Sequence, residues 1–241
     1  MSRALALVIS SLCALLLNAC ALPTPLDSGV RPVGMSKRPP VESDEGSISG
    51  AMHSELIQSL LMQKQYYAAL AHVEAAQSEE GATPELRYLE AEARRELGQS
   101  AQAQALYTGL LRSVYAAEAY QGLGLLQGAR KDWSGAIEQL TLAVERKPAS
   151  AAMRGDLGYA LMAAGRWNEA LTELATAVEL DPGSARNRNN LIVLLMLNGD
   201  EAGVKRVASA SDVSRQALVK LRVQAQSLRQ SLRGSSRRKT G

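Results

Sequence analysis

The sequence has few of the residues from which β-sheets are built. Its 241 residues contain no Phe, two Trp, 5 Ile and 14 Val, against 38 Ala and 36 Leu. Strands favour β-branched and aromatic side chains, whereas Ala and Leu are strong helix formers. This composition excludes a β-sandwich, a barrel or a doubly wound sheet and predicts an all-α protein. With 46% apolar residues, the chain as a whole is not disordered.

The residues that most often form catalytic and metal sites are also scarce. The sequence has two Cys and two His, His53 and His72, which are too few for a zinc cluster or a Cys–His nucleophile. Gly122, Gly124 and Gly128 follow no strand and do not form a phosphate-binding loop. We therefore expect no catalytic residue, no metal, no cofactor and no small-molecule substrate, and a protein that is not an enzyme.

Acidic residues are missing from the C-terminal end of the chain. Residues 213–241 contain eight Lys or Arg and no Asp or Glu, while residues 20–212 contain 18 basic and 24 acidic residues. A basic tail on an acidic body suggests an anionic partner, such as a membrane surface, a nucleic acid or an acidic protein. The alternative is a solvated helix end, whose cations suit the helix dipole.

The N-terminus is typical of an exported protein. Residues 1–19 read as a signal peptide, because a short basic start precedes the apolar stretch Ala4–Leu17, which is too short to span a bilayer. The following Leu17-Asn18-Ala19-Cys20 resembles a bacterial lipobox. The resemblance implies cleavage before Cys20, acylation of Cys20 with fatty acids such as palmitate, and, with Ala21 next, an outer-membrane anchor facing the periplasm. The alternative is an ordinary cleavage region.

Residues 20–49 have the composition of a tether. They include five prolines among glycines, serines and charged residues, without periodicity. Such segments stay extended and bury too little apolar surface to fold. We expect the acylated cysteine to be joined to the folded part by this disordered segment.

The region from 50 to 210 repeats with a period of 34 residues. The offset superposes small residues, a leucine and a proline of one copy on those of the next: Gly124 on Gly158, Ala136 on Ala170, Leu140 on Leu174, Ala143 on Ala177 and Pro148 on Pro182. This is the period of the tetratricopeptide repeat (TPR), in which small residues allow two antiparallel helices to cross closely. We predict a superhelical TPR solenoid with helix pairs starting near residues 50, 84, 117, 151 and 185.

The segment after the repeats has helical periodicity. Apolar residues from Val213 to Leu232 recur every three or four positions, which predicts an amphipathic helix. We expect residues 211–233 to form a capping helix and residues 234–241 a basic disordered tail.

In TPR proteins, the first helix of each pair lines a concave surface. Transferred to this chain, the surface positions predict a partner-binding groove, charged near its start and apolar toward its end: Tyr88, Glu92, Arg95, Leu125, Tyr159, Met162, Asn189, Val193 and Met196. Tyr and Met suit an apolar helix or an extended peptide. The alternative is that the C-terminal helix folds back and occupies the apolar end.

The lipobox, the Pro-rich tether, the two strong repeats and the run Arg186–Leu195 with Asn198-Gly199-Asp200 resemble the TadD family of Flp (tight-adherence) pilus lipoproteins. The resemblance implies a pilotin-like assembly factor that helps the pilus secretin reach or oligomerise in the outer membrane. Other possibilities are a scaffold for type IV pilus assembly, outer-membrane protein insertion or peptidoglycan remodelling, and a regulator of a partner enzyme. Export argues against nucleic acid as a partner.

Overall fold

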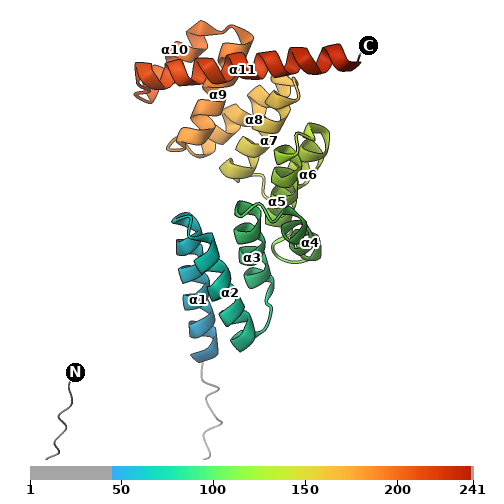
Figure 1. Ribbon diagram of the computed structural model, residues 1–241. Helices are drawn as coiled ribbons and strands as arrows, with labels where there is room; N and C mark the ends of the chain where they lie inside the picture. Colours follow the sequence, from blue (N-terminus) through green and yellow to red (C-terminus); the bar gives the residue numbers. More distant parts are fainter. Residues whose placement is uncertain (1–44, 240–241) are drawn as a thin grey trace, which may run out of the picture. The chain divides into compact units, whose positions relative to one another are not determined.

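The computed structural model describes residues 45–239, and within this range all regular structure is helical (Figure 1). The helices are α1 (Glu45–Met62), α2 (Tyr66–Glu80), α3 (Pro84–Glu96), α4 (Ser100–Leu110), α5 (Ala116–Ala129), α6 (Trp133–Arg146), α7 (Ala151–Ala163), α8 (Trp167–Leu180), α9 (Ala185–Asn198), α10 (Glu201–Ala210) and α11 (Arg215–Lys239). The predicted all-α fold is confirmed. The signal peptide, Cys20 and most of the expected tether lie outside the described residues.

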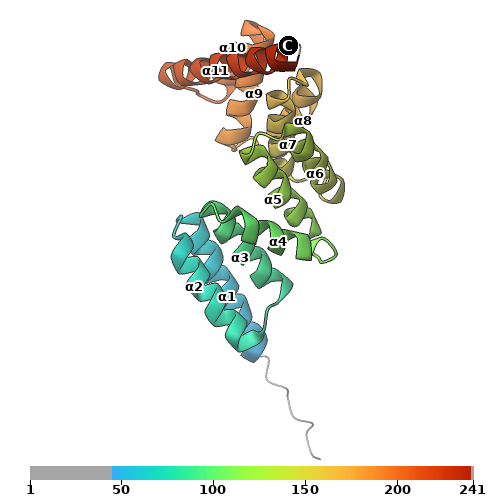
Figure 2. The same ribbon diagram turned by 45° about the vertical axis from the view of Figure 1, so that its right-hand side comes forward.

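Consecutive helices pack as pairs, from α1 with α2 to α9 with α10, and each pair contacts the next (Figures 1 and 2). The first helices of the last four pairs begin at Pro84, Ala116, Ala151 and Ala185, beside the expected starts at 84, 117, 151 and 185. No described helix is long and apolar enough to cross a membrane.

Two boundaries differ from those expected from the sequence. The α1 helix begins at Glu45, inside the segment expected to be a tether. The α11 helix runs from Arg215 to Lys239, so the expected tail from 234 to 239 is helical, not disordered. A single Gly in a helix costs only about 1 kcal/mol relative to Ala, so Gly234 does not by itself end α11.

Side-chain caps and prolines set the ends of the helices. Thr83, Ser150 and Ser184 each accept a hydrogen bond from the backbone N–H three residues later, at the starts of α3, α7 and α9. Pro148 and Pro182 lie in the turns after α6 and α8. A proline disfavours helical backbone in the residue before it, and α6 and α8 accordingly end two residues before each proline.

The small residues of the repeat lie where helices cross. A Cβ atom added at Gly124 would lie 2.6 Å from Cγ of Leu140, and one added at Gly158 would lie 2.6 Å from Cγ of Leu174. The four repeated alanines are fully buried: Ala136, Ala143, Ala170 and Ala177. A larger side chain at these positions would push the paired helices apart.

Candidate partner-binding surface

The first helices of successive pairs contact one another, α3 with α5, α5 with α7 and α7 with α9. They therefore form a continuous surface, and the expected groove residues are on it: Tyr88, Glu92 and Arg95 on α3, Leu125 on α5, Tyr159 and Met162 on α7, and Asn189, Val193 and Met196 on α9. The structure divides these residues into half-buried side chains and core side chains.

A charged network occupies the α3 end of this surface. Arg95 donates to Glu92 at 2.8 Å and is paired with Glu96 at 2.6 Å. The hydroxyl of Tyr107, from α4, also donates to Glu92. Burial raises the pKa of the Tyr107 phenol, and the Glu92 carboxylate raises it further. Glu92 therefore accepts from two side chains and holds α3 to α4.

Asp156 of α7 connects three of the first helices. Its side chain is 1% exposed, accepts from Gln121 of α5 at 2.7 Å, and is paired with Arg186 of α9. Burial raises the pKa of Asp156, although Arg186 and Gln121 lower it. We call Glu92, Arg95, Gln121, Asp156 and Arg186 the polar ladder, since together they run across α3, α5, α7 and α9.

Two tyrosines stack beside the polar ladder. The rings of Tyr88, on α3, and Tyr115, just before α5, have centroids 5.2 Å apart and planes 19° apart. Both side chains are half-buried. Burial raises the pKa of Tyr88, and the neighbouring Glu92 and Glu118 raise it further. Tyr88 also packs against two clusters of core residues, so the tyrosine pair is partly in the core and partly at the surface, next to hydrogen-bonding groups.

Further along the surface, Leu125 and Tyr159 are also half-buried. Tyr159 packs edge-on against Trp133 of α6, with ring centroids 6.1 Å apart. Tyr159 therefore also supports the α6–α7 contact.

The expected apolar end of the groove is part of the core. Met162 and Val193 are 0% exposed and Met196 is 8% exposed. α9 is packed against α7, α8, α10 and α11, which leaves its apolar residues no free face. These three residues are therefore not available to a ligand. Only Asn189, of the expected α9 positions, is half-buried.

The α11 helix covers α9, in agreement with the alternative in which the C-terminal helix folds back on the array. Leu221 and Ala225 of α11 join the same core cluster as Val193. The guanidinium of Arg229 donates to the backbone carbonyls of Met196, at 3.3 Å, and Leu197, at 2.7 Å. These carbonyls belong to the last turn of α9, where helical hydrogen bonding leaves acceptors unsatisfied, although the Met196 carbonyl also accepts from the backbone N–H of Gly199 at 3.3 Å.

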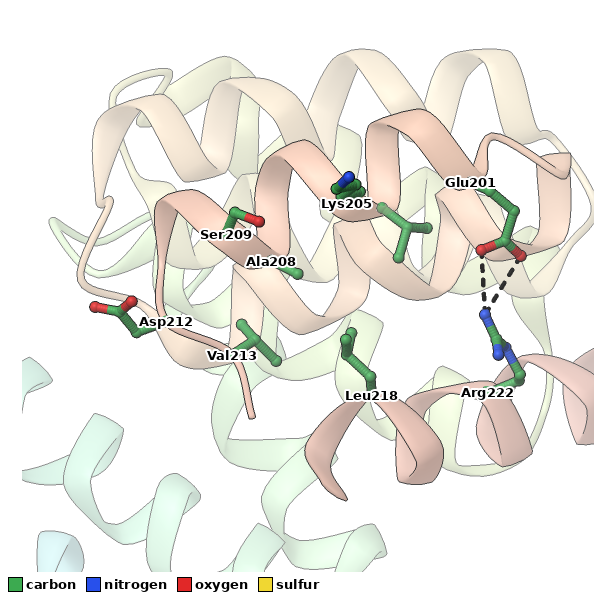
Figure 3. A pocket seen from close by; sticks show the side chains of 9 residues that line it. Glu201, Lys205, Ala208, Ser209, Asp212, Val213, Leu218 and Arg222 are labelled. Carbon is green, nitrogen blue, oxygen red and sulfur yellow. Dashed lines mark hydrogen bonds and ion pairs between the residues drawn. The ribbon is translucent and has the colours of Figure 1, made fainter. Parts of the chain in front are cut away.

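A cavity of about 480 Å³ opens between α10 and α11 (Figure 3). Its apolar lining comes from Val204, Ala208, Val213 and Leu218. Glu201 accepts from Arg222 at 3.1 Å at one end, and Lys205 and Asp212 also line it. Because both signs of charge are present, charge gives the cavity no preference for an anion or a cation.

Two residues of this surface were not predicted from the sequence: Asp156, which accepts a hydrogen bond from Gln121, and Tyr115, which stacks on Tyr88. One signal was present: Asp156 is the only acidic residue of α7, a helix otherwise rich in Ala, Gly, Leu and Met. Its partners lie 35 and 30 residues away in the chain, so no local pattern indicated them. Among the described residues, no group of three His, Cys, Asp or Glu side chains could hold a metal ion.

Comparisons with known proteins agree with this geometry. Two family models described as tetratricopeptide repeat match residues 88–151 and 129–189. No curated protein matches the sequence significantly. The described helices have the fold of a TPR solenoid.

Solved TPR structures resemble the chain at low identity. A thermophilic TPR protein from Thermus thermophilus is 21% identical, with a TM-score of 0.56, over 74% of this chain and 98% of that one. MamA from Desulfovibrio magneticus RS-1, from residue 41 onward, is 20% identical, with a TM-score of 0.54, over 69% and 96%. YrrB, a TPR protein with an unusual peptide-binding site, is 19% identical, with a TM-score of 0.50, over 70% and 89%. These likenesses show the fold.

Proposed function

We propose that the chain is a non-catalytic, pilotin-like TPR lipoprotein that holds a segment of an unassembled partner protein against α3, α5 and α7. The main support for this proposal is the stacked pair Tyr88–Tyr115, which lies beside the polar ladder. The α11 helix packs on α9, away from this pair. Aromatic side chains that are already fixed bind a partner at low entropic cost.

The chemistry of this surface favours an extended peptide. The stacked rings offer a flat apolar face for an aliphatic, aromatic or arginine side chain. Next to them, the half-buried side chains of Glu92 and Arg95 supply an acceptor and a donor for backbone amides of the peptide. A TPR protein with a peptide-binding site among the similar structures, YrrB, supports the same use of the fold.

The proposal also covers where the protein is located and which protein it binds. The lipobox resemblance supports acylation of Cys20 in the outer membrane, and the tether would then hold the array in the periplasm. The TadD resemblance supports the Flp pilus secretin, or another pilus assembly subunit, as the partner. Anchoring would raise the local concentration of the scaffold where secretin subunits assemble.

Site-specific crosslinking tests both parts. A photoreactive amino acid placed at Tyr88 should capture a partner in intact cells, while the same group at Tyr67, 75% exposed on α2, serves as the control. Capture of the secretin from position 88 alone supports the proposal. Capture of cell-wall hydrolases or insertion factors without a secretin overturns the pilus role in favour of another envelope scaffold or an enzyme regulator. Equal capture from both positions overturns the site.

Once a partner segment is known, its affinity tests the tyrosine pair. Tyr88→Leu retains much of the buried apolar volume but removes the stacked ring, and we expect it to weaken binding on the order of tenfold. Tyr67→Leu makes the same change on an exposed face and should leave the Kd unchanged.

A further inference from the structure

The α11 helix carries a second exposed surface, on the side turned away from the array. Its inward side is apolar, with Leu221 and Ala225 buried and Leu218, Leu228 and Leu232 half-buried. On the outward side, Val219 is 64% exposed and Val223 61% exposed. These two valines are four residues apart, so they lie next to each other on one face of the helix.

Cations flank the two valines. Arg215, Lys220 and Arg222 are all exposed. Arg215 lies four residues before Val219, Arg222 lies three after it, and Lys220 lies three before Val223, so each cation neighbours a valine on the helix surface. Arg222 has an acidic partner, Glu201, but both side chains are more than half exposed, so this pair contributes little. The α11 helix itself contains no acidic residue.

The charge of the folded chain is strongly polarised along its length. Residues 45–199 contain 13 basic and 18 acidic residues, a net charge of −5. Residues 200–241 contain 10 basic and 3 acidic residues, a net charge of +7. At physiological salt, charges more than about 8 Å apart are largely screened, so the acidic helices do not cancel the field at α11. An anionic surface would meet the chain at its α11 end.

We propose that the outward face of α11 binds the surface of an anionic phospholipid bilayer. The cations would contact headgroup phosphates, and Val219 and Val223 would enter the boundary between headgroups and acyl chains. The valines favour a bilayer over a nucleic acid, whose phosphate backbone offers no apolar region to them. An acidic protein is the competing partner. This inference goes beyond the proposed function, because it concerns a different helix face and does not depend on the groove or on Cys20.

Vesicle co-sedimentation tests the proposal. We would use the mature chain, residues 20–241, carrying Cys20→Ser, so that neither the signal peptide nor an acyl chain contributes. The vesicles would be phosphatidylcholine alone or with about 30% phosphatidylglycerol, a fraction that gives a strongly negative surface. We expect binding to the anionic vesicles that exceeds binding to the neutral ones by tenfold or more and falls steeply with salt. Each basic residue near an anionic bilayer adds to the binding free energy. Arg215→Gln with Lys220→Gln removes two such residues and should therefore reduce the partition coefficient roughly thirtyfold.

Matched variants separate α11 from the rest of the molecule. Arg112→Gln with Arg130→Gln removes two exposed cations from other parts of the array and should leave binding unchanged. Val219→Ser with Val223→Ser should weaken binding to the anionic vesicles at low salt, because it removes the apolar contribution and leaves the cations in place. Circular dichroism confirms that each variant is folded.

Three results of the vesicle experiments would overturn the proposal. Equal binding to neutral and anionic vesicles, or equal loss in the Arg112 and Arg130 variant, overturns the proposal. So does binding to polyglutamate or duplex DNA without binding to anionic vesicles. Crosslinking from position 88 should be unaffected by the α11 variants, so failure of this proposal is distinguishable from failure of the groove.

Discussion

Tyr107 of α4 lies directly against Gly122 of α5 while its hydroxyl donates to Glu92 of α3. One side chain thus joins three helices, and the hydrogen bond fixes the ring over the glycine. A Cβ atom at position 122 would lie 2.5 Å from Cε1 of Tyr107, far inside van der Waals contact. The absence of a side chain at Gly122 is therefore a requirement of the α4–α5 packing.

Gly122→Ala should destabilise the protein by about 2 kcal/mol, the usual cost of forcing an extra carbon into a packed core. The measurement is the free energy of unfolding by urea. Gly109→Ala is the matched control, because Gly109 is also helical but has nothing within 4 Å of an added Cβ. It should stabilise by up to about 1 kcal/mol through helix propensity alone. Equal effects of the two substitutions would contradict the steric argument.

Arg229→Met should loosen α11 from α9. It removes the two hydrogen bonds to the carbonyls of Met196 and Leu197, which together should cost roughly 1–2 kcal/mol. Hydrogen exchange of residues 215–233 should speed up while exchange in α5 and α6 stays the same. Arg222→Gln, which breaks only an exposed ion pair, should change exchange little. Uniform acceleration through the whole array would show that Arg229 does not act locally.

Asp156 should make stability depend on pH. Its pKa lies above the ordinary value of 3.8 in the folded protein because the carboxyl group is buried. The native state thus holds the proton more tightly than the unfolded chain, and ionisation weakens the native state as pH rises from about 4 through the folded pKa. Compared with Asp156→Asn, the wild type should therefore be relatively most stable below about pH 4 and lose that advantage as pH rises through the folded pKa.

Urea unfolding of both proteins at several pH values measures this difference. Glu138→Gln removes an exposed carboxylate and controls for the change in net charge. A wild-type advantage that grows as pH rises would reverse the sign and show that Arg186 and Gln121, not burial, dominate.

Cys20→Ser should release the protein from membranes. If Cys20 is acylated, the wild type stays with the outer-membrane fraction after a high-salt wash, because several acyl chains give stable anchoring. The variant should wash off, since any binding through α11 is mainly electrostatic and screened by salt. Retention of the variant in the outer-membrane fraction after the high-salt wash would argue against the lipoprotein assignment.

The sequence alone contained most of the fold. The 34-residue period follows from Gly124, Ala136 and their counterparts one repeat later, because a close helix crossing allows only small side chains at those points. The starts of the helix pairs could be predicted for the same reason, aided by the capping residue Ser150 and the prolines. The charged end of the candidate surface was also predictable, since Tyr88, Glu92 and Arg95 occupy known positions of a first helix.

The tertiary structure decided which apolar residues a partner can reach. Leu191–Leu197 is apolar on every side of α9, so its pattern does not distinguish a groove from a core; the packing of α11 makes Val193 and Met196 core residues. The tertiary structure also brings Asp156 together with Gln121 and Arg186, which are far apart in the chain. The periodicity of a sequence shows which side of a single helix is apolar. Which helix then covers that side, and which distant polar groups pair, depends on packing between helices.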